Sequence, residues 1–100
     1  MNADHVRNYF LSCPEAIEDF PFGNEVHVFK IKEKMFGFLA YREGFARVNL
    51  KCDPDEAIML RRRFESVIPG YHMNKTHWNT LVLDGTIPND EIEVMIENSY

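Results

Sequence analysis

The residues whose types could do chemistry are concentrated between Pro69 and Thr80. This segment holds two of the four histidines and the single tryptophan, together with amide and ammonium groups that donate hydrogen bonds. Aromatic rings beside such donors are typical of surfaces that stack on flat ligands such as nucleobases. The segment therefore predicts a binding surface, and its candidate residues are Asn74, Lys75, His77, Trp78 and Asn79.

The two histidines of this segment, His72 and His77, could also act as general bases or as metal ligands. A catalytic base needs a nucleophile beside it and donors that stabilise developing charge, and neither a paired nucleophile nor a glycine-rich loop accompanies them. The sequence also lacks the His-x-x-x-His and Cys-x-x-Cys spacings of common metal sites. We therefore expect hydrogen-bonding histidines, no metal, no cofactor and no enzymatic activity.

The overall charge argues against binding to phosphate, because the chain has 16 acidic and 11 basic residues and a net charge of -5. Affinity for nucleic acid depends largely on contacts between cations and phosphates. An acidic protein can still carry a basic face, so the positions of the cations matter more than their number. Lys30 and Lys32 in one segment, and Arg47 and Lys51 in another, alternate with apolar residues. These four cations are predicted to share the polar side of a sheet.

The composition is that of one soluble globular domain. The chain has 100 residues, of which 45% are hydrophobic and 27% charged, which is enough for a core without disulfides. Its apolar runs are far shorter than the ~20 residues of a membrane span, and Asp4 stands where a secretory signal would be basic and then apolar. Cys13 and Cys52 lie in separate predicted elements. We expect a cytoplasmic monomer with both thiols reduced.

The elements that must position these residues follow from the spacing of apolar positions. Helical spacing predicts a helix over residues 3–13, capped by Asn2, and a further short helical turn over residues 15–19. A two-residue period then predicts three antiparallel strands over residues 26–32, 35–41 and 45–52.

The run Asp53-Pro54-Asp55-Glu56 predicts the start of a second helix. Asp53 is expected to accept hydrogen bonds from the backbone amides near Asp55 or Glu56, with Pro54 at the first helical position. This helix is predicted to run to about Val67 and to stop at Pro69-Gly70, and the run 61–63 of three arginines is predicted to form a solvated face.

Strands over residues 71–74 and 77–83, joined at Lys75-Thr76, and a third helix capped by Asn89 complete the chain. The predicted order is α-β-β-β-α-β-β-α. This is a single α+β domain over residues 1–100, with an antiparallel sheet of about five strands covered by helices on one face. The last helix reaches Tyr100 without a C-cap signal, so a natural end and a shortened chain are both compatible with it.

Several short motifs in the same order resemble the MmcQ/YjbR family of small bacterial proteins. They are Phe20-Pro21-Phe22-Gly23, Lys34-Met35-Phe36, residues 69–75 with His77-Trp78-Asn79, and Ile87-Pro88 before Asp90-Glu91. The resemblance covers essentially the whole chain. It implies a frataxin-like (CyaY-like) fold and a DNA-binding role, and members of this family commonly run on past the point where this chain ends. Frataxin-like folds also suggest acidic surfaces that hold iron.

Two kinds of function remain open at this stage. One is a nucleic-acid-binding module in which Lys30, Lys32, Arg47 and Lys51 contact phosphate and the segment 74–79 stacks and bonds. The other is a small interaction module that holds a protein or small ligand on the same surface. Trp78 either stacks on a ligand or is a half-buried sheet residue. Asn74, Lys75 and Asn79 either contact a ligand or satisfy backbone groups in a tight turn.

Overall fold

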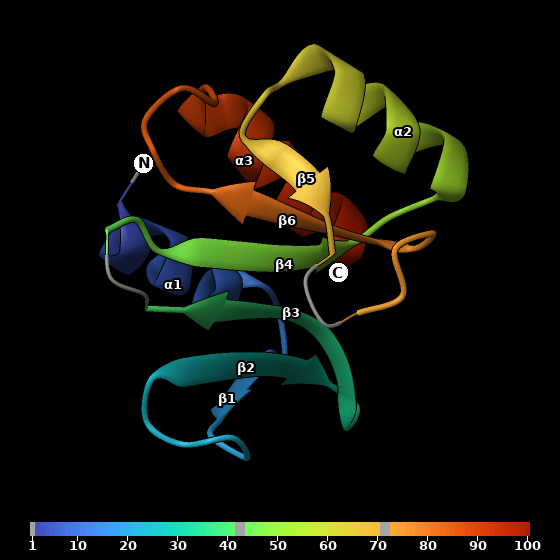
Figure 1. The fold of residues 1–100 in the computed structure, drawn as a ribbon. Helices are drawn as coiled ribbons and strands as arrows, with labels where there is room; N and C mark the ends of the chain where they lie inside the picture. The colour runs from blue at the N-terminus through green and yellow to red at the C-terminus, as the bar shows by residue number, and fades with distance from the viewer. Residues whose placement is uncertain (1, 42–43, 71–72) are drawn as a thin grey trace.

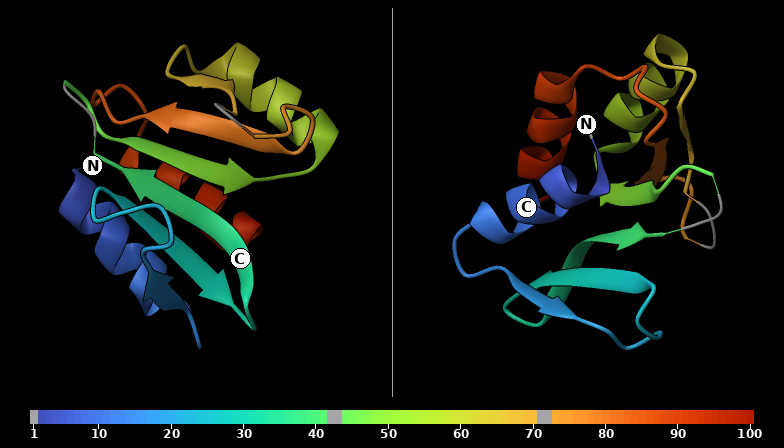
Figure 2. Two further views of the ribbon diagram at one scale, coloured as in Figure 1. Left: turned by 60° about the horizontal axis from the view of Figure 1, so that its bottom comes forward. Right: turned by 90° about the vertical axis from the view of Figure 1, so that its left-hand side faces the viewer.

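The computed structural model describes residues 2–41, 44–70 and 73–100. In this part of the chain, three helices cover one face of a six-stranded sheet with the strand order β1-β2-β3-β4-β6-β5 (Figures 1 and 2). Every pair of neighbouring strands is antiparallel. The predicted α+β class and one-sided antiparallel sheet are therefore confirmed, with one strand more than expected.

The order of helices and strands along the chain is the predicted one, apart from the additional strand β1. Their bounds are α1 Ala3–Ser12, β1 Ile17–Asp19, β2 Val26–Ile31, β3 Lys34–Ala40, β4 Arg47–Lys51, α2 Pro54–Arg63, β5 Val67–Pro69, β6 Trp78–Val82 and α3 Asn89–Ser99. Among the described residues, none of the helices has the length and apolar character that a transmembrane span requires.

The core lies between the sheet and the helices, and Phe10 of α1 is one of its central residues. Phe10 of α1 is fully buried and stacks on Phe29 of β2, with ring centroids 4.2 Å apart and planes 4° apart. The ring passes over Gly37 of β3, where an added Cβ would lie 2.5 Å from the Cε1 atom of Phe10. A glycine is therefore needed at this position for α1 to lie so close to the sheet.

The predicted helical turn over residues 15–19 is wrong, because residues Ile17–Asp19 form the edge strand β1. Glu15 has a φ of 64°, a left-handed conformation that ends helical geometry. Glu18 then pairs with Phe29 of β2 and places its carboxylate against Arg7 of α1. Pairing with β2 thus determines the structure of a segment too short to show a period of its own.

The second helix is shorter than predicted. It ends at Arg63, and Phe64 is extended, with φ −126° and ψ 122°. The strand that pairs with β6 is β5. The predicted strand over residues 71–74 is not formed at residues 73 and 74, which lie in a loop. Tyr71 and His72 lie outside the described residues. β-Branched Val67 and Ile68 favour a strand, and Pro69 is tolerated because β5 is at the edge of the sheet.

The starts of α1 and α2 lie where the sequence predicts them, but not every predicted capping contact is formed. Asn2 caps α1, accepting from the His5 amide at 2.8 Å. Asp53 occupies the N-cap position of α2 with Pro54 following it, but its side chain makes no capping hydrogen bond, so the predicted capping contact is wrong. Asn89 is the first residue of α3 and not its cap, which is Pro88.

The two N-caps therefore predict different responses to mutation. Asn2→Ala should lower the free energy of unfolding by about 0.5–2 kcal/mol, because it removes the acceptor for the His5 amide. Asp53→Ala should cost less than Asn2→Ala, since no such bond is lost. Urea denaturation of both variants measures the difference. Equal losses, or a larger loss for Asp53→Ala, would contradict the assignment of the caps.

Candidate nucleic-acid interface

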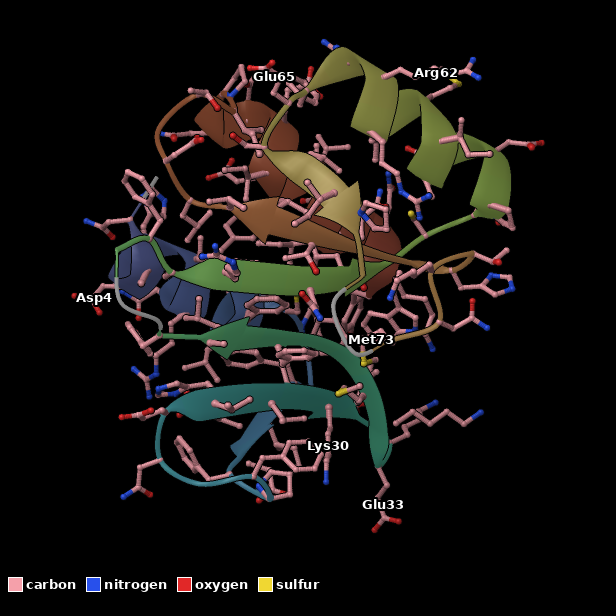
Figure 3. All side chains as sticks on the ribbon, in the orientation of Figure 1. Asp4, Lys30, Glu33, Arg62, Glu65 and Met73 are labelled. Carbon is pink, nitrogen blue, oxygen red and sulfur yellow. The ribbon has the colours of Figure 1, made fainter. Side chains whose placement is uncertain are left out.

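The face of the sheet without helices carries three of the four predicted cations, and we call this side the open face. Lys51 lies opposite Trp78 on β6, Arg47 lies opposite Val82, and Lys30 of β2 lies opposite Met35. The fourth cation, Lys32, lies just beyond β2, in a two-residue turn with Glu33 where both φ values are positive, 50° and 67°. In Figure 3, Lys30 and Met73 lie over the side of the sheet turned toward the viewer.

The middle of the open face consists of buried side chains, and the cations Arg47 and Lys51 lie on either side of it. Val28, Asn49 and Thr80 are at most 2% exposed, and Thr80 donates a hydrogen bond to the side-chain oxygen of Asn49 at 2.6 Å. The predicted uniformly polar face is therefore interrupted by a buried row across β2, β4 and β6. Contact with a ligand would use the two ends of β4, where Arg47 and Lys51 lie.

These cations differ in how much of their charge is neutralised. The ammonium of Lys30 lies 2.8 Å from the carboxylate of Asp19, and this hydrogen bond is the main cause that lowers the pKa of Asp19. Arg47 donates to the carbonyl of Phe45 at 2.9 Å. Within the described ranges, no carboxylate lies within ion-pairing distance of Arg47 or Lys51. These two are thus the available cations of the open face.

Trp78 is 7% exposed, so it is a sheet residue as in the second alternative, but it is buried and not half-buried. The Lys51 ammonium lies 5.5 Å from the centroid of its ring, a cation–π contact. On its other side, Gly70 is so close that an added Cβ would lie 2.7 Å from the Cβ of Trp78. Stacking of a base on this ring stays a prediction, and it would require the ring to become more exposed.

The described part of the loop between β5 and β6 is held by its own polar side chains. Lys75 donates to the Gly70 carbonyl at 3.0 Å, and the Asn74 side-chain oxygen accepts from the Thr76 amide at 2.8 Å. Both side chains therefore close the turn, while Asn74, Lys75 and His77 remain exposed. The ligand contacts of these three residues stay predictions.

Asn79 lies on the opposite side of the sheet, buried against α2. Its side-chain oxygen accepts from Nε of Arg61 at 2.6 Å, and its amide nitrogen donates to the Ala57 carbonyl at 3.3 Å. The Arg61 guanidinium also donates to the backbone carbonyls of Lys75 and Trp78. Arg61 therefore is not on a solvated face as predicted. Its position four residues after inward-facing Ala57 is the sequence signal that could have placed it.

A polar depression of about 400 Å³ lies beside Lys51, at the start of α2, and is lined by Lys51, Cys52, Asp53, Glu56, His77, Asn98 and Ser99. The Cys52 thiol borders it, and burial is the main cause that raises the pKa of this thiol. A raised pKa disfavours the nucleophilic thiolate. Among the residues that the structure describes, no three His, Cys, Asp or Glu side chains are arranged to hold a metal ion.

A cluster that sequence reasoning missed joins β1 to α1. Both Nε and Nη2 of Arg7 donate to the Glu18 carboxylate at 2.7 Å, and Nδ1 of His27 lies 2.7 Å from the same carboxylate. The rings of Phe20 and Tyr41 pack against the edges of His27. The hydrogen bonds from Arg7, more than those from His27, hold the pKa of Glu18 below its ordinary value of 4.5.

Glu18 should make the protein acid-sensitive. Because its pKa is lowered on folding, its contribution to stability is present above about pH 4.5 and is lost as the pH falls through the folded-state pKa. Glu18→Gln should therefore flatten the decline of the thermal midpoint between about pH 5 and about pH 3. The control Glu65→Gln, at an exposed position, should keep the wild-type slope. Parallel curves for wild type and Glu18→Gln would contradict this role.

Comparison with known proteins finds similar sequences along nearly the whole chain. The sequence model of the YjbR family matches residues 11–100. The YjbR protein of Escherichia coli K12 is 29% identical over 100 residues, covering 100% of this chain and 85% of that protein. The YbdF protein of Escherichia coli O157:H7 is 36% identical over 81 residues, covering 81% of this chain and 66% of YbdF.

Two solved structures are similar in fold as well as in sequence. The crystal structure of the Deinococcus radiodurans protein DR2400 superposes with a TM-score of 0.92 at 36% identity, covering 99% of this chain and 75% of that one. A Pseudomonas syringae crystal structure superposes with a TM-score of 0.87 at 27% identity, covering 100% of this chain and 97% of that one.

Proposed function

The chain belongs to the YjbR family, and from this premise and the geometry of the open face we propose that it is a DNA-binding protein that acts by binding and not by catalysis. The contact surface is the open face, with Arg47 and Lys51 on phosphates. The exposed loop residues Asn74, Lys75 and His77 border the same surface and supply further donors.

The observation that carries this function is the arrangement of the two cations on β4. Arg47 and Lys51 project to the side of the sheet that has no helix, and neither is paired with a carboxylate in the described part of the chain. Lys51 follows Arg47 by four positions along the strand, a distance of about 13 Å. Along that distance an extended nucleic-acid strand presents several phosphates, so both cations can act on one strand.

The net charge of -5 does not oppose this arrangement, because part of the acidity lies away from the open face. Helix α3 contains four acidic residues and no basic one, and they are Asp90, Glu91, Glu93 and Glu97. This helix lies on the covered face of the sheet (Figure 2). It would repel phosphate from that side, so the charge distribution favours one orientation of a nucleic-acid ligand.

Titration of labelled single- and double-stranded DNA at several salt concentrations tests this function. Arg47→Ala together with Lys51→Ala should weaken binding to all sequences alike. Loss of two phosphate contacts should reduce the slope of log K against log salt by about 1.8 for duplex DNA and about 1.4 for single strands. The matched control, Lys34→Ala with Arg63→Ala, also removes two positive charges, but from positions outside the open face, and should leave the slope unchanged.

Two results would overturn DNA binding by this face. One is a wild-type protein that shows no salt-dependent binding at low ionic strength. The other is an equal loss for the β4 variant and the Lys34→Ala/Arg63→Ala control, with circular dichroism showing both folded. Trp78→Ala is unsuitable as a first test because the side chain is buried and its removal would destabilise the fold.

A second candidate function is a protein-binding module on the same face. Ile17, opposite Lys30, is 54% exposed, and Ile68, opposite Thr80, is 37% exposed. Exposed apolar side chains at both edges of a sheet are suited to a protein partner. Binding that is insensitive to salt and is lost on Ile17→Glu would favour this alternative over DNA.

A further inference from the structure

Helix α2 leaves large apolar side chains uncovered on the side away from the sheet. Met59 is 67% exposed and Ile58 is 44% exposed, and Val94 on neighbouring α3 is 48% exposed. Between the two helices lies a groove of about 390 Å³, with Met59, Leu60, Val94 and Met95 among its lining residues. Exposed apolar side chains beside an apolar groove mark an interaction surface.

The charges on α2 are ordered along the helix. Its first turn is acidic, with Asp55 and Glu56, and its last turn is basic, with Arg62 and Arg63 exposed. Asp55, Met59 and Arg62 are spaced i, i+4 and i+7, so they lie in one stripe along the helix. Within residues 2–41, 44–70 and 73–100, neither Asp55 nor Arg62 has an ion-pair partner. Arg62 projects outward from the upper end of the molecule in Figure 3.

Because of this order, two copies of the stripe that lie antiparallel bring opposite charges together. We propose that the partner of α2 is a second copy of the chain, bound through antiparallel pairing of the two α2 helices about a two-fold axis near Met59. Asp55 of each copy then faces Arg62 of the other, and the two Met59 side chains meet near the axis. The sequence predicted a monomer, because apolar exposure on a helix cannot be read from composition.

Several features of α2 favour a second copy over an unrelated protein. A two-fold interface uses the same patch twice, so opposite charges must lie at equal distances on either side of an apolar centre. The midpoint between Asp55 and Arg62 falls between the apolar residues Ile58 and Met59, so the two charges meet that condition. Parallel pairing would instead place acid against acid, base against base and helix dipoles in the same direction. The flexible Met59 side chain can also adapt to the groove of the other copy.

The contact is small, so the association should be weak and concentration-dependent. One helix and the edge of a second bury less than the ~800 Å² per partner of a standard stable interface. Sedimentation velocity over roughly 10 µM to 1 mM protein should therefore show the mass rising from the 11.8 kDa monomer toward the dimer. A wild-type protein that stays monomeric over this whole range would overturn the proposed contact.

Substitution of Met59 tests the centre of the contact. Met59→Glu places two like charges beside the axis and should weaken association at least about tenfold. Phe22→Glu is the matched control, because Phe22 is 73% exposed but lies far along the chain, in the loop before β2. It should leave association unchanged. Equal effects of the two substitutions would overturn the assignment to α2.

A charge swap tests the antiparallel orientation. Arg62→Glu alone opposes an acid to Asp55 of the other copy, and Asp55→Arg alone opposes a base to Arg62. Each should weaken association, and the weakening should be largest at low salt, where the repulsion between like charges is least screened. The double variant restores opposite charges across the axis and should recover wild-type association. Failure of the double variant to recover, with its circular dichroism unchanged, would overturn the antiparallel pairing.

Discussion

The positions of α2 and of the loop before β6 both depend on one buried polar contact, between Arg61 and Asn79. Asn79 is 1% exposed, and both ends of its amide are bonded to α2. The same guanidinium reaches the backbone carbonyls of Lys75 and Trp78. Charge-assisted hydrogen bonds of this kind are stronger than neutral ones, and leaving such an amide unbonded would cost about 1–3 kcal/mol. The contact therefore fixes the helix and the loop together.

A second constraint decides which face of the sheet remains uncovered. Gly37 allows the Phe10 ring to lie against β3, so α1 packs at the centre of one face. On that face α3 contacts both α1 and β4: Tyr9 donates to Glu97 at 2.7 Å, and the Lys51 amide donates to Ser99 at 3.0 Å. Once α2 is joined through Asn79, all three helices lie on this side. The cations of β4 are then directed to the other side by the alternation of the strand.

The sequence predicts an element correctly where burial of one face gives its apolar residues a regular spacing. It does not predict segments that are too short to show such a spacing. Val48 and Leu50 are buried on the helical side while Arg47 and Lys51 are not, so β4 could be read directly from alternation. Strands β1 and β5 have three residues each, too few for a pattern, and both exist because a longer strand pairs with them. The end of α2 was placed too late because Phe64 and Val67 fit the helical stripe equally well.

The sequence singles out the candidate site residues, but it does not give the direction of their side chains. Side-chain types near Trp78 indicated ligand binding, yet the direction of each side chain depends on β6 starting at Trp78. That start puts Trp78 on the open face and Asn79 against α2. The acceptors of Lys75 and Asn74 are backbone groups of the same loop, which sequence alone left as one of two alternatives. Arg61 was missed because its two arginine neighbours are exposed.

The two proposed surfaces lie on different sides of the molecule and do not compete for residues. The open face uses β4 and the loop before β6, while the self-association surface uses the outward stripe of α2 and the edge of α3. A pair of chains would therefore present two open faces at once. Linking two weak contacts makes the second effectively intramolecular and raises the combined affinity without any new contact. A small acidic protein with two available cations on one face could in this way bind a polyanion that a single copy would hold only weakly.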